Sequence, residues 1–369
     1  MNSGRLKALF LRGPIGLTVV SIILGFTVGG IVLVVAGFNP FEAYGAILKG
    51  TFSKPKYIAY VIIYATPLIM TGLSVAFAMR TGLFNIGAEG QFIVGAMVAA
   101  MAGYALHLPI WLHVPLCLLL AMMAAALWGG LAGYIKARFG VHEVISTIML
   151  NWTAFYLSNW SLTLSGFGKP GTGKSFTIQE TARIDLFSQW KISKEGILFI
   201  RSHEYLGDVL KAPVNLGIVV AIVLALLVWY ILNRTTLGYE LRAVGFNPHA
   251  AEYGGINVKR SIVTSMSIAG GLAGAAGALQ VMGVSHKIAK LAVMEGYGFD
   301  GIAVALIGNN SGPGSVLAGF LFGGLKYGGS KIQDAVGAPT EVISIVVGTI
   351  ILFIAMPKLI QTLLKFRKG

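Results

Sequence analysis

The chain has 369 residues, of which 56% are hydrophobic and only 11% carry a charge. An average soluble domain is about a quarter charged, so this composition excludes a water-soluble globular enzyme. Lysine and arginine outnumber aspartate and glutamate by 28 to 14, which leaves a formal net charge of +14. In a membrane protein, such an excess indicates which loops stay in the cytoplasm.

In chain order, the apolar runs predict an all-α integral membrane protein with about ten transmembrane helices in a single domain over residues 1–369. A hydrocarbon layer about 30 Å thick needs about 20 apolar residues in a helix. Two Gly-rich runs between 284 and 340 are shorter, so we expect broken or re-entrant segments there. The predicted spans are 14–37, 57–79, 92–109, 112–134, 144–162, 214–232, 261–283, 298–308, 314–329 and 341–357.

The charges orient these spans. The segments assigned to the cytoplasm, which include both termini and the loop 234–260, hold lysine and arginine in excess over acids. The long polar stretch 163–213 has a more balanced charge and is expected to be an external loop. We therefore expect both termini in the cytoplasm.

A short repeat links two distant spans. The tetrapeptide Glu-Val-Ile-Ser opens the fifth predicted span at 143–146 and the tenth at 341–344. In the predicted topology one of these spans enters from the inside and the other from the outside. This predicts an inverted repeat of spans two to five onto spans seven to ten.

Residues 168–175 match the phosphate-binding pattern GxxxxGK[ST]. That motif binds phosphate only where a buried strand precedes the glycine-rich turn and a helix follows it. In this chain the segment follows a predicted span and belongs to the external loop, so we interpret it as a flexible Gly/Lys loop. The single cysteine, Cys117, lies in an apolar run and indicates neither a disulfide nor a metal cluster. We expect no cofactor and no metal site.

Polar residues interrupt the apolar chain in two glycine-rich segments, 80–91 and 295–301, and once more within the fifth span. Irregular backbone at membrane depth is tolerated only where protein or a water-filled cavity covers it, so these segments are expected to line a path for a polar solute. The alternatives are an ordinary cytoplasmic turn for the first segment and a hydrogen bond between helices for the fifth span. The candidate path residues are Asn85, Glu89, Gln91, Asn151, Trp152, Tyr297, Phe299 and Asp300.

The loop 234–260 contains the pattern of a short capped helix. Asn247 can cap a helix that begins at Pro248, and Gly254 with Gly255 can end it after about two turns. Such a helix between two spans suits the docking of another protein, and the alternative is a simple connecting loop. The candidate docking residues are Arg242, Gly245, Asn247, Ala250, Ala251 and Gly254.

At these residues the chain resembles a known family, the permease subunits of ATP-binding-cassette (ABC) importers in the ribose, branched-chain amino acid and nucleoside group. The resemblance extends from the first predicted span to the tenth. Residues 82–91, 236–251 and 298–306 carry its most specific motifs. Within the group, the chain is similar to the larger permease of bacterial nucleoside importers, because of residues 88–91 and 143–151 and the long loop after them.

The resemblance implies a permease domain in the bacterial cytoplasmic (inner) membrane that pairs with a second permease. It also implies two cytoplasmic ABC ATPase subunits or domains docked at 242–255, and an external substrate-binding lipoprotein that delivers a small polar substrate. Nucleosides are the expected substrate, with sugars or branched-chain amino acids as the alternative, and no nucleic acid partner is expected. The chain itself would not be an enzyme, because ATP hydrolysis belongs to the separate ATPase. An ion-coupled secondary transporter that uses Glu89, Glu143 and Asp300 is one alternative to this importer, and an integral-membrane enzyme is the other.

Overall fold

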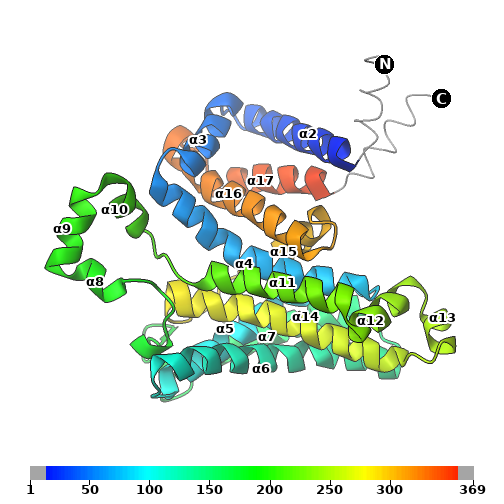
Figure 1. Ribbon diagram of the computed structural model, residues 1–369. Helices are drawn as coiled ribbons and strands as arrows, with labels where there is room; N and C mark the ends of the chain where they lie inside the picture. Colours follow the sequence, from blue (N-terminus) through cyan, green and yellow to red (C-terminus); the bar gives the residue numbers. More distant parts are fainter. Residues whose placement is uncertain (1–13, 356–369) are drawn as a thin grey trace, which may run out of the picture. The chain divides into compact units, whose positions relative to one another are not determined.

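The structure, a computed structural model, describes residues 14–355 and is predominantly helical (Figure 1). The predicted positions of the two termini fall on residues 1–13 and 356–369, which lie outside the described residues. The all-α prediction is confirmed. Among the described residues, four helices are long and apolar enough, by length and composition alone, to cross a membrane: Pro55–Arg80, Ile110–Phe139, Gly217–Arg234 and Val258–Ser285. The total of ten spans stays a prediction.

The described residues form a succession of helices that a single short hairpin interrupts. In chain order the elements are α2 (Pro14–Val35), α3 (Pro40–Phe52), α4 (Pro55–Arg80), α5 (Ala88–Ala105), α6 (Ile110–Phe139), α7 (Glu143–Ser161), β1 (Gly168–Lys169), β2 (Lys174–Ser175), the 3-10 turn Glu180–Ala182, α8 (Ser188–Ile192), α9 (Lys194–Ser202), α10 (Glu204–Leu210), α11 (Gly217–Arg234), α12 (Thr236–Phe246), α13 (Pro248–Tyr253), α14 (Val258–Gln280), the π-helical turn Val281–Ser285, α15 (Tyr297–Ile307), α16 (Gly312–Val336) and α17 (Thr340–Ala355).

The described chain divides into two compact units. The larger unit comprises residues 58–323, and the smaller one combines residues up to 57 with those from 324 onward. Each helix that crosses a boundary, α4 or α16, contributes to both units. The prediction of one permease domain over the whole chain stays a prediction.

In the larger unit, α14 packs along α6 and α5 (Figure 1). Small residues make this close packing possible, because a Cβ added to Gly95 of α5 would lie 2.2 Å from the backbone oxygen of Gly274. A Cβ on Gly129 of α6 would likewise lie 2.4 Å from the backbone oxygen of Met266. Helices in lipid associate through such close van der Waals contact rather than through the hydrophobic effect. The stripe of small residues on α14 therefore fixes the three-helix core of this unit.

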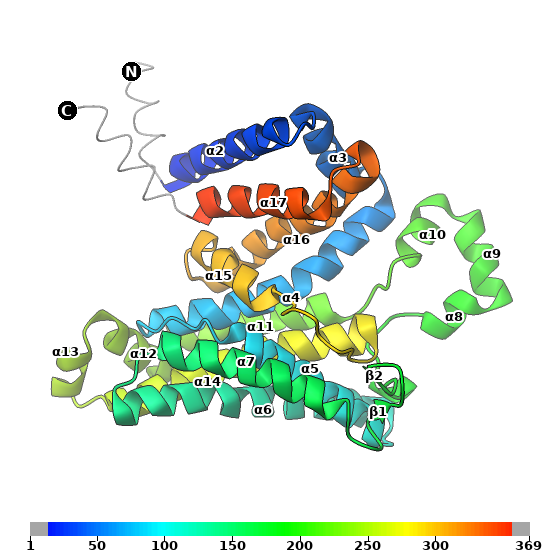
Figure 2. The ribbon, with the colours of Figure 1, turned by 180° about the vertical axis from the view of Figure 1, so that it is seen from behind.

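The two long loops lie at opposite ends of the larger unit (Figures 1 and 2). Helices α12 and α13 are at one end, and the hairpin β1–β2 with helices α8 to α10 is at the other. This separation is the one expected for an internal loop and an external loop.

The segment that matches the phosphate-binding pattern forms the antiparallel hairpin β1–β2, in which Gly168 pairs with Ser175. No helix follows it directly, so the context that phosphate binding requires is missing in this part of the described chain. The hairpin differs from the flexible loop we expected, because backbone hydrogen bonds hold it. The Ser175 N–H donates to the oxygen of Ile288 at 2.9 Å, and the Lys290 N–H donates to the oxygen of Gly173 at 2.7 Å.

Irregular backbone in the first polar segment is shorter than the sequence indicated. Helix α5 begins at Ala88, so Glu89 and Gln91 lie in its first turn and only residues 81–87 are non-helical. An acidic residue is favourable in the first turn because the helix N-terminus carries a partial positive charge. The second segment breaks as expected, with α15 forming a short helix after the irregular residues 286–296.

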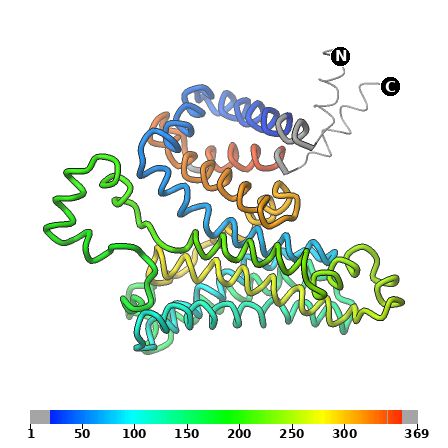
Figure 3. The backbone as a smooth tube through the Cα atoms, viewed as in Figure 1, coloured from blue at the N-terminus to red at the C-terminus, as the bar shows by residue number. Residues whose placement is uncertain are grey.

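The order of elements repeats along the chain (Figure 3). A long helix, an irregular segment, a shorter helix and two further helices occur as α4 to α7 and again as α14 to α17. This recurrence agrees with the inverted repeat, which stays a prediction.

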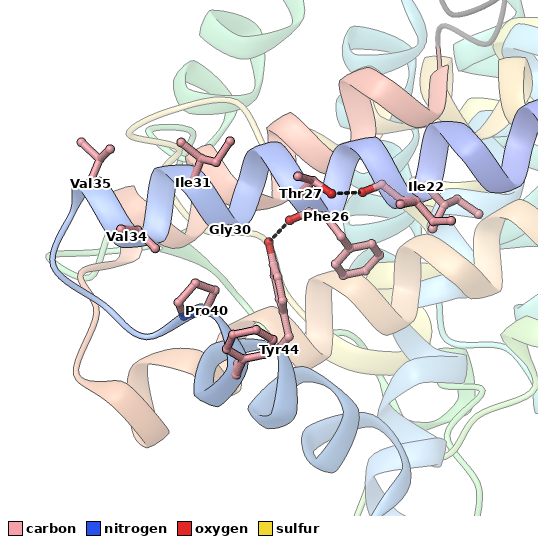
Figure 4. Close-up of a pocket in the computed structure, with 11 residues that line it drawn as sticks. Ile22, Phe26, Thr27, Gly30, Ile31, Val34, Val35, Pro40 and Tyr44 are labelled. Carbon is pink, nitrogen blue, oxygen red and sulfur yellow. Dashed lines mark hydrogen bonds between the residues drawn. The ribbon is translucent and has the colours of Figure 1, made fainter.

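The smaller unit contains α2, α3 and α17 and the adjoining parts of α4 and α16. Helix α3 was not anticipated from the sequence, because its mixed composition shows no span-length apolar run. A groove of about 580 Å³ lies between α2 and α3 and has an apolar lining (Figure 4). The Tyr44 hydroxyl at this groove donates to the backbone oxygen of Phe26 at 2.6 Å, which ties α3 to α2.

Candidate functional site

Glu89 joins the first turn of α5 to the start of α15. Its side chain is fully buried, and each carboxylate oxygen accepts one backbone hydrogen bond. Oε1 accepts from the Gly296 N–H at 2.7 Å, and Oε2 accepts from the Gly298 N–H at 2.7 Å. A carboxylate that accepts two backbone N–H groups makes strong charge-assisted bonds. The two polar segments predicted from the sequence therefore meet directly.

The backbones of these two segments touch at the same place. A Cβ added to Gly298 would lie 2.2 Å from the backbone nitrogen of Glu89, so only glycine fits there. Gly296 precedes α15 with φ of 83°, a left-handed conformation that favours glycine. The N-termini of α5 and α15 thus converge on one carboxylate, which compensates the partial positive charge at the start of α15.

Asn85 and Gln91 form a reciprocal amide pair within the first segment. The Asn85 Nδ2 donates to Gln91 Oε1 at 2.8 Å, and the Gln91 Nε2 donates to Asn85 Oδ1 at 3.1 Å. Asn85 Nδ2 also donates to the hydroxyl of Ser74 on α4 at 3.1 Å. Both amides are buried, so this pair closes residues 81–87 against α4 and α5.

Asn151 links α7 to the same segment. Its Oδ1 accepts from the Gly90 N–H at 2.8 Å, and its Nδ2 donates to the oxygen of Ile86 at 3.0 Å. One of these bonds joins α7 to α5, as the alternative interpretation of Asn151 expected, and the place of Asn151 in a substrate path stays a prediction. Asn151 lies roughly two turns into α7, so the start of α5 sits well inside the helical bundle rather than at its end.

The remaining path candidates differ in exposure. The Tyr297 ring packs on Phe92 with centroids 5.3 Å apart, and the Tyr297 backbone oxygen accepts from the Thr71 hydroxyl at 2.9 Å. Trp152 and Phe299 lie on exposed faces of α7 and α15, and Asp300 is half-buried. The structure therefore brings Asn85, Glu89, Gln91, Asn151 and Tyr297 together and leaves Trp152 and Phe299 on the surface of the larger unit.

The start of α7 holds the beginning of the first segment. The Glu143 carboxylate accepts from the Phe84 N–H at 3.2 Å and forms an ion pair with Lys136 at the end of α6. On the other side, Arg80 Nε donates to the backbone oxygen of Asn310 at 2.8 Å, beyond the end of α15. The segment is thus attached to the start of α7 and to the turn after α15.

The predicted capped helix in the loop 234–260 is confirmed as α13. The Asn247 side chain accepts from the N–H groups of His249 at 3.0 Å and Ala250 at 3.1 Å, and Pro248 is the first helical residue. Gly255 has φ of 85° and ends the segment. Among the docking candidates, Asn247, Ala250 and Gly254 are exposed and Ala251 is buried, while the Arg242 guanidinium reaches the Asn233 side chain at 3.3 Å.

Gly245 does not face outward but packs against the end of α4. A Cβ added there would lie 2.3 Å from the backbone oxygen of Arg80. Gly82, which has φ of 73°, lies within 3.5 Å of the Gly245 backbone by the same measure. The candidate docking loop therefore touches the polar segment that begins at residue 80. Sequence spacing could not reveal this contact between two separate motifs.

Two aromatic side chains beside α13 were missed by the sequence analysis. Phe246 is 90% exposed and Tyr253 is 97% exposed, one just before α13 and one at its last residue. Large exposed aromatic side chains next to a defined helix are typical of protein contact sites. Their signal in the sequence was an aromatic residue at each end of an otherwise small and polar helix.

At the opposite end of the unit, backbone hydrogen bonds join the predicted external loop, residues 163–213, to residues 282–291. The Ile184 N–H donates to the oxygen of Met282 at 3.0 Å, and the Ile178 N–H donates to the oxygen of His286 at 2.9 Å. His286 Nε2 lies 3.4 Å from Asp185 Oδ1. Burial lowers the pKa of the His286 imidazole, and nearby Arg183 lowers it further, whereas Asp185 opposes this shift. The loop is therefore attached to the segment that leads to α15.

These features define a helical membrane transport protein whose chain breaks within the bundle. Residues 57–355 match the family model of the branched-chain amino acid transport system / permease component, and the chain belongs to this family. Its members are transport components of ABC systems rather than enzymes. The chain is accordingly a multi-pass membrane permease that functions with ATPase and substrate-binding components.

Three relatives are similar over almost the whole chain. The guanosine ABC transporter permease protein NupP of Bacillus subtilis is 42% identical over 336 residues, which cover 91% of each chain. The nucleoside ABC transporter permease protein NupB of Lactococcus lactis is 33% identical and covers 95% of this chain and 93% of the relative. The glucose ABC transporter permease protein TsgB13 of Haloferax volcanii is 31% identical and covers 92% and 86%. No solved structure matches the chain.

Proposed function

We propose that this permease forms part of an ATP-driven importer of nucleosides. The proposed substrate class is supported by the 42% identity with a guanosine permease across 91% of both chains. A nucleoside is an uncharged polar solute with a flat ring, and amide, hydroxyl and aromatic side chains suit its recognition. The convergence of Asn85, Gln91 and Tyr297 near Glu89 supports a polar path of this kind.

In this proposal the described conformation is closed at Glu89. The buried polar groups of both broken segments bind each other, so a solute can pass only when α15 moves relative to α5. Transporters built from repeats move solutes by rocking such bundles around a site at the broken helices. Glu89 and the Asn85–Gln91 pair would gate the path, while the exposed Trp152 and Phe299 suit a boundary with a second permease.

In this proposal the ATPase docks on the loop 234–260 and drives transport through it. Phe246 and Tyr253 would anchor α13 on the ATPase, together with Asn247, Ala250 and Gly254. The contact of Gly245 with Arg80 would carry the movement of the ATPase into the first polar segment. This route is short, because residues 80–91 connect that contact directly to Glu89.

We place the loop 234–260 and both chain termini in the cytoplasm and the loop 163–213 outside, where a substrate-binding lipoprotein would dock. The excess of lysine and arginine supports this orientation. The location of α13 and of α8 to α10 at opposite ends of the larger unit also supports it.

The test is uptake by the purified permease reconstituted with its companion permease, its ATPase and its binding protein. Guanosine should enter the liposomes only with ATP, and an ionophore that collapses ion gradients should not stop it. Uptake by this chain alone, abolished by the ionophore, would indicate an ion-coupled transporter instead.

A sugar substrate is the second candidate, because the glucose permease of Haloferax volcanii is 31% identical to this chain. The same assembled importer distinguishes the two. Import of labelled glucose without import of guanosine would favour the sugar.

A further inference from the structure

A cavity of about 150 Å³ lies in the larger unit, between the broken segment 286–296 and the helices beside it. Helix α5 contributes Phe92, Ile93 and Ala96, and α7 contributes Ser158. The end of α14 and its π-helical turn contribute Gln280, Val281 and Ser285. π-Helical turns occur frequently at functional sites. Lys287 and Glu295 are exposed and lie at the rim.

Two polar side chains in this cavity are without hydrogen-bond partners among the described residues. The Ser158 residue is only 3% exposed and Gln280 is partly exposed, and no hydrogen bond joins the Ser158 hydroxyl or the Gln280 amide to residues 14–355. Buried polar groups are nearly always paired, with protein, water or a ligand. The two groups are therefore available to bind whatever occupies the cavity.

The size of the cavity limits what it can hold. Pockets for drug-sized ligands are about 300–1,000 Å³, and one water occupies about 30 Å³, so the cavity of about 150 Å³ holds roughly five waters or a small planar group. Phe92 supplies an aromatic wall, and its ring packs on the ring of Tyr297, the residue that follows Gly296, whose N–H Glu89 binds. Ile288 also lines the cavity, and its backbone oxygen accepts from the N–H of Ser175 in the loop 163–213.

We propose that this cavity binds the base ring of the nucleoside before the path opens at Glu89, a proposal that rests on the proposed function. The Gln280 amide presents a donor and an acceptor side by side, which match adjacent groups on the edge of a nucleobase. The ring of Phe92 provides a face for stacking, which every base can use. Ser158 completes the set with a hydroxyl that can donate or accept.

The first test compares uptake kinetics of the reconstituted importer. Gln280→Met keeps the length of the side chain and removes its hydrogen bonds, and Ser158→Ala removes only the hydroxyl. Each variant should raise the KM for guanosine about tenfold with a smaller effect on the maximal rate, since each loses a hydrogen bond to the bound ring. The matched control Thr153→Ala, whose hydroxyl bonds the backbone of its own helix, should leave KM unchanged.

The second test measures occupancy without transport. The chain has one cysteine, so Ser158→Cys in a Cys117→Ala background provides a single thiol in the cavity. A methanethiosulfonate reagent should label it in the reconstituted importer, and guanosine and free guanine should both slow the labelling, whereas ribose should not. Protection by ribose alone would show that the cavity binds the sugar and would overturn the proposal.

The outcomes separate the base subsite from the proposed function. If the wild-type importer takes up guanosine and both variants keep the wild-type KM, the base subsite is wrong while the proposed function stands. If the wild type takes up no nucleoside, the proposed function and the subsite both fail. A rise in KM with protection by guanine supports both.

Discussion

The Glu89 carboxylate accepts a hydrogen bond of 2.7 Å from the backbone N–H of Gly298, although 209 positions separate the two residues in the chain. This contact joins the starts of α5 and α15. Both helices begin inside the larger unit, after irregular backbone, and their N-termini meet at this carboxylate. Opening a path between the segments requires breaking this contact, which makes Glu89 the first residue to test.

Replacing Glu89 with alanine should destabilise the protein and stop transport. The N–H groups of Gly296 and Gly298 would lose their partner, and each hydrogen bond to a charged group contributes about 1.5–3 kcal/mol. We expect a lower Tm of the purified protein and a loss of uptake of at least about tenfold. Glu341→Ala, at an exposed position on α17, is the control and should change neither quantity. If Glu89→Ala kept the wild-type Tm and the wild-type uptake, Glu89 would neither stabilise the contact between α5 and α15 nor gate the path.

Removing the two exposed aromatic rings beside α13 should weaken binding of the ATPase. In the double variant Phe246→Ala, Tyr253→Ala, copurification of the ATPase with the permease should fall sharply, because buried aromatic anchors contribute about 2 kcal/mol or more each at interfaces. The folding of the permease should be unaffected, since both rings are exposed in the chain. Tyr205→Ala, at the opposite end of the unit, serves as control. Undiminished copurification would show that the ATPase binds elsewhere.

The substitution Gly245→Val should leave binding of the ATPase intact but block the transmission of its movement to the first polar segment. The new side chain would meet the Arg80 backbone, so α12 must move away from the end of α4. We expect the ATPase to copurify and to hydrolyse ATP, with uptake reduced about tenfold or more. Gly45→Val introduces the same side chain where a Cβ meets nothing within 4 Å. Normal uptake in Gly245→Val would rule out this contact as the route of coupling.

Acidification should weaken the contact between the predicted external loop, residues 163–213, and residues 282–291, and so lower the stability of the protein. Burial lowers the pKa of His286 below its ordinary value of 6.5, with a further lowering by Arg183 that Asp185 partly offsets. The folded state therefore binds a proton less readily than the unfolded state, so stability is full above pH 6.5 and falls as the pH drops below it.

The measurement is the Tm of the purified protein at about pH 7.5 and about pH 5.5, on either side of the ordinary histidine range. His286→Asn should show a smaller decrease, because asparagine does not titrate and tolerates the φ of 54° at this position. An equal decrease in both proteins would assign the pH dependence to other groups.

The helical class and most segment positions follow from composition and from the length of the apolar runs. The capped helix α13 was predicted from Asn247, Pro248 and the following glycines, because capping depends on residues only a few positions apart. Helix α3 was missed, since its partly apolar sequence has neither the length nor the hydropathy of a span. The two broken segments were identified by glycines and polar residues in an apolar context.

The sequence by itself determined that this is a helical membrane protein with polar breaks in its chain, since the bilayer imposes span length and hydropathy on local sequence. Its resemblance to a known family added the permease class. Only the tertiary structure decided what the polar residues do. It paired Glu89 with the start of α15, Asn151 with the start of α5, and Gly245 with Arg80. It also left Ser158 and Gln280 facing a cavity. Such pairings depend on the packing of distant helices on small residues, and no spacing along the chain specifies which buried donor meets which acceptor.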